Sequence, residues 1–330
     1  MIYLHVPFCG SFCTYCDFYS EICRGGRAFN EYADAVLKEV NDRKEEICMN
    51  MSAPRAVNTL YIGGGTPSVL PLDVLRRIVG ALLSSRSLRR GENTVGAQSP
   101  FEEFTVEVNP EDIVEKGGEY VRGLLETGVD RVSMGIQSFD DGILRWMNRR
   151  HSAAGAVEAF RILRRCGVRN ISVDLIFGLS QLADDVWEDT IERALELAPE
   201  HISAYQLSIE EGSALAKLVA DGRYVEASDE QCRHQYDVLC QTLRQAGYHH
   251  YEISNFARPG FEAVHNSAYW SRVPYIGLGP GAHSLTGDIR SWNSQELPHR
   301  STDGSPATYS RTSETLSPED IRVERIMLSL

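Results

Sequence analysis

The sequence lacks the long apolar runs that are typical of membrane proteins. No stretch of about 18 uninterrupted apolar residues occurs in its 330 residues, and the charged fraction of 24% is ordinary for a globular protein. The N-terminus leads directly into a strand-like segment, without a basic region, an apolar signal segment or a small-residue cleavage site. From these absences we expect no membrane anchor and a cytoplasmic location.

An excess of basic residues is also absent. The chain has 33 Lys and Arg residues against 46 Asp and Glu residues, which gives a formal net charge of −13 at pH 7. Proteins that bind nucleic acids mainly through the phosphates present a basic surface. We therefore expect no nucleic-acid partner.

Eight cysteines are present, and the expected cytoplasmic location makes disulfides improbable for them. Metal ligands or buried thiols are the alternatives that fit a reducing compartment. Cys48, Cys166, Cys232 and Cys240 lack the spacing of ligands, so the sequence assigns them no role.

Strand-like and helix-like patterns alternate along the chain. Apolar alternation and flanking turn residues predict six strands, near residues 2–6, 58–62, 104–108, 130–136, 170–177 and 201–208. Helical patterns lie between them, for example at 30–47 and 186–197, and a long loop is expected at 85–102. This order predicts an α/β fold with a parallel sheet, and about six units favour an incomplete (β/α) barrel over a closed eightfold one.

A change of pattern near residue 247 predicts a domain boundary. Before it, a helix is expected at 228–246, with Ser228 as its N-cap and Cys232 in the core. After it come an aromatic, Gly/Pro-rich region, a polar stretch at 293–317 and a helical start at 318–330. The sequence thus predicts a barrel over 1–247 and a small C-terminal appendage over 248–330.

Three cysteines within eight residues are the strongest chemical signal. Cys9, Cys13 and Cys16 follow the first predicted strand with the spacing CxxxCxxC. Thiolates are the usual ligands of iron–sulfur clusters, and three of them on a four-iron cluster leave one iron open to a small chelating molecule. This spacing is the signature of radical S-adenosylmethionine (SAM) proteins. A zinc site completed by His5, or three unligated thiols, are the alternatives.

A glycine-rich turn follows the second predicted strand, from Gly63 to Pro67. Glycines let backbone amides approach a ligand closely, although such a turn is often only a turn. Its place one unit after the cysteine loop favours a role in binding.

Polar residues interrupt three of the predicted apolar strands, namely Glu107, Gln137 and Asp174. In a parallel barrel, such side chains point inward or lie near the carboxyl ends of the strands, where barrel enzymes build their sites. A buried carboxylate needs partners, and Arg149 is a candidate either for that role or for the carboxylate of SAM. An internal network of salt bridges is the alternative, but the cysteine loop favours ligand binding.

The segment from His265 to Trp270 has the pattern HNxxYW. A histidine beside aromatic residues is able to ligate heme iron while the rings pack on the porphyrin. On pattern alone, a hydrogen-bonded core or surface histidine is the more common outcome.

Taken together, these segments resemble the HemW proteins, which are radical SAM heme chaperones of the oxygen-independent coproporphyrinogen III oxidase-like family. The resemblance runs from Tyr3 to Leu330, with the motifs in order and at compatible spacing. The segments that carry it are His5–Phe18, Gly63–Pro67, Val106–Pro110, Gly135–Phe139, Asn148–Arg149, Asp174–Gly178 and His265–Trp270.

The resemblance implies a three-quarter parallel (β/α)6 radical SAM barrel with a [4Fe–4S] cluster on Cys9, Cys13 and Cys16. It implies that SAM contacts Tyr3, Gly64, Gly65, Thr66, Glu107, Gln137, Arg149 and Asp174. It also makes His265 the candidate heme-iron ligand. The implied partners are heme, an external reductant and a heme-acceptor protein, with a membrane-bound respiratory protein as the candidate acceptor; a homodimer is left open.

The true oxidases of this family carry a fourth cysteine two positions after the third, and Phe18 occupies that position here. This difference favours a heme chaperone, with oxygen-independent coproporphyrinogen III oxidation by a radical SAM mechanism as the alternative. Relatives continue into a further C-terminal domain, so the resemblance also implies that the appendage is truncated at Leu330.

Overall fold

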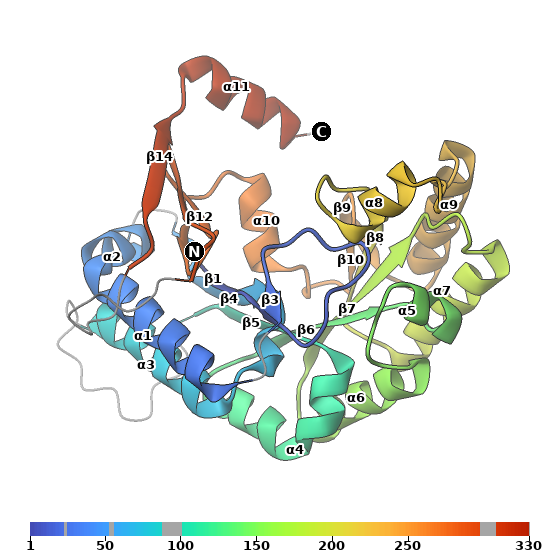
Figure 1. Cartoon of the computed structure of the whole chain (residues 1–330), viewed down its shortest axis with the longest axis horizontal. Helices are drawn as coiled ribbons and strands as arrows, with labels where there is room; N and C mark the ends of the chain where they lie inside the picture. Colours follow the sequence, from blue (N-terminus) through green and yellow to red (C-terminus); the bar gives the residue numbers. More distant parts are fainter. Residues whose placement is uncertain (23–24, 53–55, 88–100, 298–307, 330) are drawn as a thin grey trace.

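The computed structural model describes residues 1–22, 25–52, 56–87, 101–297 and 308–329 (Figure 1). Most of the predicted loop at 85–102 and part of the polar stretch at 293–317 lie outside the described residues.

Six parallel strands form the centre of a nine-stranded sheet. In spatial order they are β1 (Ile2–Val6), β4 (Thr59–Gly64), β5 (Glu103–Val108), β6 (Arg131–Gln137), β7 (Asn170–Phe177) and β8 (His201–Gln206). All six predicted strands are thereby confirmed to within a few residues. Their order in space follows their order in the sequence, as repeated βαβ units require.

Helices connect these strands and cover the outer side of the sheet, as Figure 1 shows. The helices of this outer layer are α1 (Gly26–Asp42), α2 (Lys44–Ser52), α3 (Leu72–Ser87), α4 (Pro110–Glu126), α6 (Ala153–Arg165), α7 (Asp184–Leu197) and α9 (Asp229–Gln245). The shorter η1 (Pro67–Val69), α5 (Asp141–Trp146) and α8 (Ala214–Ala220) lie at the carboxyl ends of the strands, near the cysteine loop. Helix α1 buries Phe29, Tyr32, Val36 and Val40, whose spacing forms one apolar stripe. In α9, Ser228 caps the first turn by accepting a hydrogen bond from Gln231 N at 3.2 Å, and Cys232 is buried, as predicted.

Three short strands extend the sheet on both sides of the parallel centre. Strand β11 (Ile276–Leu278) is parallel to β1, whereas β10 (Asn255–Ala257) is antiparallel to β8 and to β9 (His249–Glu252). The edge strands β11 and β9 do not pair with each other in the described residues, so the sheet stays open. The sheet also continues across residue 247, so the predicted division into 1–247 and 248–330 does not separate two sheets.

The remaining elements lie at the two ends of the chain and beside the barrel. Strands β2 (Phe8–Cys9) and β3 (Glu21–Ile22) flank the cysteine loop, and α10 (Val264–Trp270) contains the HNxxYW segment. A second antiparallel sheet contains β12 (His283–Thr286), β13 (Ile289–Asn293) and β14 (Arg311–Thr315), which the sequence did not predict as strands. The predicted C-terminal helix is α11 (Pro318–Met327), which begins with a capping box at Ser317.

The inner face of the sheet is unusually polar for a barrel. Barrel interiors are normally filled by branched apolar side chains. Here Arg131, Ser133, Gly135 and Gln137 alternate along β6 and line one cavity together with residues of β4, β5, β7 and β8. The lumen is therefore built to hold a ligand. Within the described part of the chain, no helix combines the length and apolar character needed to cross a membrane.

Glu39 of α1 ties the C-terminal part of the chain to the barrel. Its carboxylate accepts hydrogen bonds from Gly279 N at 2.9 Å, from Asn293 Nδ2 at 2.8 Å and from Arg43 Nη1 at 2.9 Å. The Glu39 side chain is buried, and so is that of Arg43. Removing one partner of a buried ion pair leaves the other without compensation.

We expect Glu39→Ala to lower the free energy of unfolding by about 2 kcal/mol, because it leaves the buried Gly279 amide without its acceptor and removes one of the two carboxylates that pair with Arg43, the other being Glu46. Glu31→Ala is the matched control: Glu31 pairs with Arg27 on the exposed side of the same helix, and its loss should cost less than about 1 kcal/mol. Denaturant unfolding of the metal-free proteins measures both values. Equal, small effects of the two substitutions would contradict the assigned role of Glu39.

Candidate functional site

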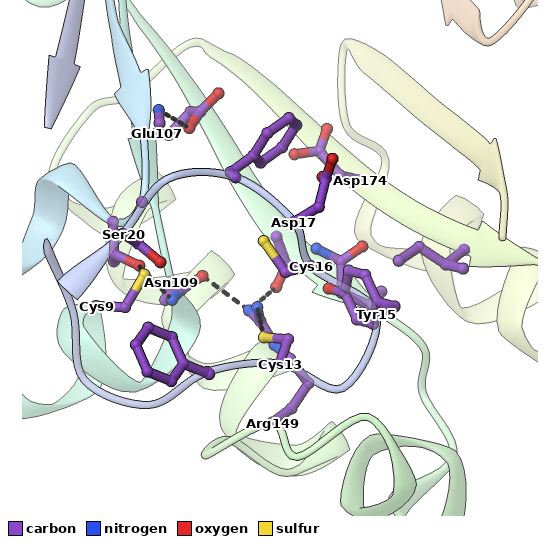
Figure 2. Close-up of a pocket in the computed structure, with 18 of the residues that line it drawn as sticks. Cys9, Cys13, Tyr15, Cys16, Asp17, Ser20, Glu107, Asn109, Arg149 and Asp174 are labelled. Carbon is purple, nitrogen blue, oxygen red and sulfur yellow. Dashed lines mark hydrogen bonds between the residues drawn. The ribbon is translucent and has the colours of Figure 1, made fainter. Parts of the chain in front are cut away.

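The cysteine loop covers a cavity of about 940 Å³ at the carboxyl ends of the parallel strands. Figure 2 shows Cys9, Cys13 and Cys16 on this loop, together with Glu107 of β5, Asp174 of β7 and Asn109 at the start of α4. This is the edge of the sheet at which parallel α/β proteins place their ligands.

The loop is held in place from several sides. Thr14 donates two hydrogen bonds to the end of α5, from its backbone N to Met147 O at 3.0 Å and from its hydroxyl to Trp146 O at 2.8 Å. Asn148 Nδ2 donates to Phe12 O at 2.7 Å. These contacts fix a segment that has little regular structure of its own, so the sulfur atoms are positioned before any ligand binds.

The thiols of Cys9 and Cys16 are suited to a metal cluster rather than to nucleophilic chemistry. Burial raises the pKa of Cys9, and it raises the pKa of Cys16 to about 11. A reactive cysteine needs a lowered pKa, whereas a coordinated thiol is deprotonated by the metal itself. The Cys13 Sγ accepts a hydrogen bond from Arg149 Nη1 at 3.5 Å, which places a cation beside the loop (Figure 2).

A zinc site with His5 as its fourth ligand is not supported. Both ring nitrogens of His5 are engaged: Nδ1 lies 3.1 Å from Tyr3 Oη, and Nε2 lies 2.9 Å from Tyr19 O. Among the described residues, no group of three or more His, Cys, Asp or Glu side chains converges closely enough to hold a single metal ion. Thiolates on one loop that all face the cavity fit a larger, multi-iron cluster better.

The glycine turn serves the packing of the protein. Gly65 N donates to Val6 O at 2.8 Å and Thr66 N to Phe8 O at 2.7 Å, while Gly64 N donates to the Glu107 carboxylate at 3.1 Å. A side chain on Gly65 would approach Phe8 O to 2.8 Å, and Gly64 has a φ of +111°. These amides donate hydrogen bonds within the protein, and contact of Gly64, Gly65 and Thr66 with a ligand in the cavity they line stays a prediction.

Two buried acidic side chains, Glu107 and Asp174, face the cavity. Burial raises the pKa of Glu107 to about 7, although Tyr61 Oη donates a hydrogen bond to its carboxylate at 2.7 Å. Burial also raises the pKa of Asp174, which accepts from the Ser133 hydroxyl. Carboxyl groups held in this way attract cationic ligands, because a nearby positive charge favours their ionised form.

Arg149 and Gln137 complete the upper part of the cavity. Arg149 Nη2 donates to Asn109 Oδ1 and to Gly135 O, both at 2.7 Å, and its Nε has no partner in the described residues. No ion pair joins Arg149 to a carboxylate there, so the predicted partnership with a buried acid is absent. Gln137 lies at an irregularity of β6 with a positive φ of 68°, a strained conformation that functional sites often retain.

The cavity brings together all the predicted site residues except Tyr3 and His265. Tyr3 is on β1, but its hydroxyl is bonded to His5. His265 is 1% exposed, with Nδ1 2.7 Å from Thr59 Oγ1 and Nε2 3.2 Å from Tyr269 Oη. Neither ring nitrogen of His265 is free in this arrangement, so iron ligation by His265 remains a prediction that would require these bonds to open.

Several polar residues that line the cavity were not assigned from the sequence. They are Asn109, Arg131, Ser133, Ser203, Tyr205 and Asn266. Most of the strand residues in this list lie two positions along the chain from an assigned residue or from another member of the list. Because alternate residues of a strand face the same side of the sheet, this spacing was the signal that could have identified them. Asn266 belongs to α10 and to the HNxxYW segment, but the sequence analysis assigned the binding role in that segment to His265 alone.

Comparison with known proteins shows what the chain is similar to. The profile of the Radical SAM superfamily matches residues 3–194. The Heme chaperone HemW of Lactococcus lactis is 31% identical over 328 residues, covering 99% of this chain and 80% of the relative. The Heme chaperone HemW of Bacillus subtilis is 34% identical over 297 residues, covering 90% and 74%. Among solved structures, the coproporphyrinogen III oxidase HemN of Escherichia coli superposes with a TM-score of 0.76 at 24% identity, covering all of this chain and 74% of its own, which shows a shared fold.

The burial of His265 predicts a specific dependence of stability on pH. Burial, aided by the nearby N-terminal and Arg131 charges, lowers its pKa to about 3. Between pH 6.5 and 3 the unfolded chain binds a proton at this residue that the folded chain does not, so the stability contributed by neutral His265 is lost as the pH falls through this window.

We therefore expect the free energy of unfolding of His265→Gln to depend less steeply on pH than that of the unmodified protein, by about 1.4 kcal/mol per pH unit between pH 6 and 4. Denaturant titrations at a series of pH values measure the slopes. An unchanged slope in His265→Gln would show that His265 titrates normally and is accessible.

Proposed function

This chain belongs to the radical SAM superfamily and, within it, to the HemW heme chaperones, and from that premise we propose that it binds a [4Fe–4S] cluster, SAM and heme and passes the heme to an acceptor protein. The observation that carries the proposal is the convergence in one cavity of three cysteines with Glu107, Gln137, Arg149 and Asp174.

Cys9, Cys13 and Cys16 are the cluster ligands in this proposal, and the residues present fit that role. They belong to one anchored loop, they face one cavity, and no disulfide consumes them. When bound, such a cluster supplies electron transfer and an open iron for a chelating ligand. Arg149, beside Cys13, would neutralise negative charge at the loop and orient a carboxylate near it.

Glu107 and Asp174 are proposed to hold the cationic part of SAM. Their raised pKa values mean that each carboxyl group is costly to ionise without a ligand, so a bound sulfonium or ammonium group would stabilise the ionised form. Gln137 offers a neutral amide at the same level of the cavity. These side chains therefore favour the binding of SAM in one defined orientation. Without a ligand they contribute little to the stability of the folded protein.

Heme binding is supported by the membership in the HemW family. The mouth of the cavity adds a physical argument, because Phe12, Phe18 and Tyr205 line it and are exposed by 50%, 66% and 43%. Exposed aromatic rings around a cavity suit a planar apolar ring system. The acceptor protein, the external reductant and a cytoplasmic location stay part of the proposal.

The cluster assignment predicts about four iron and four sulfide ions per chain after anaerobic reconstitution. We expect Cys13→Ser to lose most of both, since two thiolates do not hold the same cluster. Cys240→Ser, on α9 away from the loop, is the control and should keep the full content. Iron and sulfide analysis measures this, and retention of the cluster by Cys13→Ser would refute the ligand assignment.

The heme assignment predicts saturation near one heme per chain when the reconstituted protein is titrated with hemin and followed by its Soret band. Because His265 is buried and bonded at both nitrogens, we expect His265→Ala to keep the position of the Soret band and to lose thermal stability. A shifted band in this variant would instead identify His265 as the iron ligand. Absence of binding, with conversion of coproporphyrinogen III to protoporphyrinogen, would support the oxidase alternative.

A further inference from the structure

The floor of the cavity is formed by the first residue of β6. Arg131 lies six residues before Gln137, about 20 Å along the strand, and both side chains line the same cavity. The cysteine loop is at the opposite, carboxyl end of the strands. Arg131 is therefore far from the place proposed for the cluster and from Arg149.

Arg131 is a buried cation with two guanidinium nitrogens that have no hydrogen-bond partner among the described residues. It is 1% exposed, and the two nitrogens are Nε and Nη2. No carboxylate in that part of the chain lies within ion-pair distance of it. Leaving a guanidinium group buried and unpaired is costly, so a group that the protein itself does not provide is expected there.

The positive charge of Arg131 affects the pKa values of several groups around the floor of the cavity. It opposes the burial that raises the pKa values of Glu107 and Asp174, and it adds to the burial that keeps His201 and His265 neutral. Neither carboxylate forms an ion pair with Arg131 within the described residues, so the unbonded Nε and Nη2 of Arg131 remain the donors that are open to an anionic group.

Asn266 approaches the same cavity from α10. The helix is fixed below it, because Val264 N and His265 N donate to the Glu103 carboxylate at 2.8 and 2.9 Å and His265 is bonded to Thr59. Asn266 lines the cavity, and its amide forms no hydrogen bond with the described residues. Its N–H group is therefore a second unused donor in a cavity whose hydroxyls from Ser133 and Ser203 already serve Asp174.

We propose that Arg131 and Asn266 form a subsite for a carboxylate side chain of the tetrapyrrole that the protein carries. A guanidinium group matches the two oxygens of a carboxylate, and the amide provides a further donor. The carboxylate would lie at the floor of the cavity, beside both donors. This inference rests on the proposed heme-chaperone function, and it names the part of the cargo that the floor recognises.

Ordered water is the competing occupant, since buried water often satisfies groups such as Arg131. The two explanations differ in what they predict for a ligand whose carboxylates are blocked. Hemin dimethyl ester keeps the ring and the iron but lacks both negative charges.

The test compares hemin with hemin dimethyl ester in anaerobically reconstituted protein, followed by the Soret band. We expect the ester to bind about 10- to 100-fold more weakly, as for the loss of a hydrogen-bonded charge pair. Arg131→Gln should bind hemin as weakly as the unmodified protein binds the ester. Arg165→Gln is the matched control, because Arg165 pairs with Glu158 on the outside of α6, and it should retain the full preference.

Asn266→Ala provides a second variant that removes no hydrogen bond from the described structure. We expect it to weaken hemin binding about 2- to 10-fold and to leave binding of the ester unchanged. Equal affinity of the unmodified protein for both ligands, with no effect of Asn266→Ala, would overturn the subsite and favour ordered water while leaving the chaperone function intact. Failure of the unmodified protein to bind either ligand would overturn the proposed function and this inference with it.

Discussion

The close approach of the glycine turn to the first strand is the constraint on which the site depends. Gly65 and Thr66 donate backbone hydrogen bonds to Val6 and Phe8, so the end of β4 is fixed against the segment that leads into Cys9. A side chain at position 65 would collide with Phe8 O and crowd the Cys9 sulfur. The same turn presents Gly64 N to Glu107, and one short segment therefore aligns the cysteine loop, the first strands and a cavity carboxylate.

The polar lumen has an energetic cost that the rest of the fold must offset. Glu107, Asp174 and Arg131 are removed from bulk water without mutual ion pairs in the described structure, and such burial disfavours the charged forms. Burial of apolar side chains on the outer face of the sheet offsets this free-energy cost. That face packs against α1, α3, α4, α6 and α7 in one continuous apolar core. A lumen of this kind is retained for binding rather than for stability.

The sequence was sufficient to predict the parallel centre of the fold, because each βα unit has a local pattern. All six strands and α7, α9 and α11 lie close to the predicted ranges. Strands β9 to β14 were not predicted, since they are short, partly polar and defined by partners distant in the chain. The cavity residues on β5, β6 and β7 were predicted from polar interruptions, but Arg131 was not, because an arginine at the first position of a strand looks like an exposed flanking residue.

The HNxxYW segment shows why a motif alone does not identify the atoms that meet a ligand. Successive helical residues point about 100° apart, so His265 and Asn266 cannot serve the same surface. The structure turns His265 toward Thr59 and Tyr61, inside the protein, and leaves Asn266 on the cavity. Replacing the histidine would therefore disturb the asparagine through α10, and a loss of ligand binding on such a replacement would not by itself identify the iron ligand. The position of the Soret band distinguishes direct ligation from this indirect effect, because it depends on the atom bound to iron.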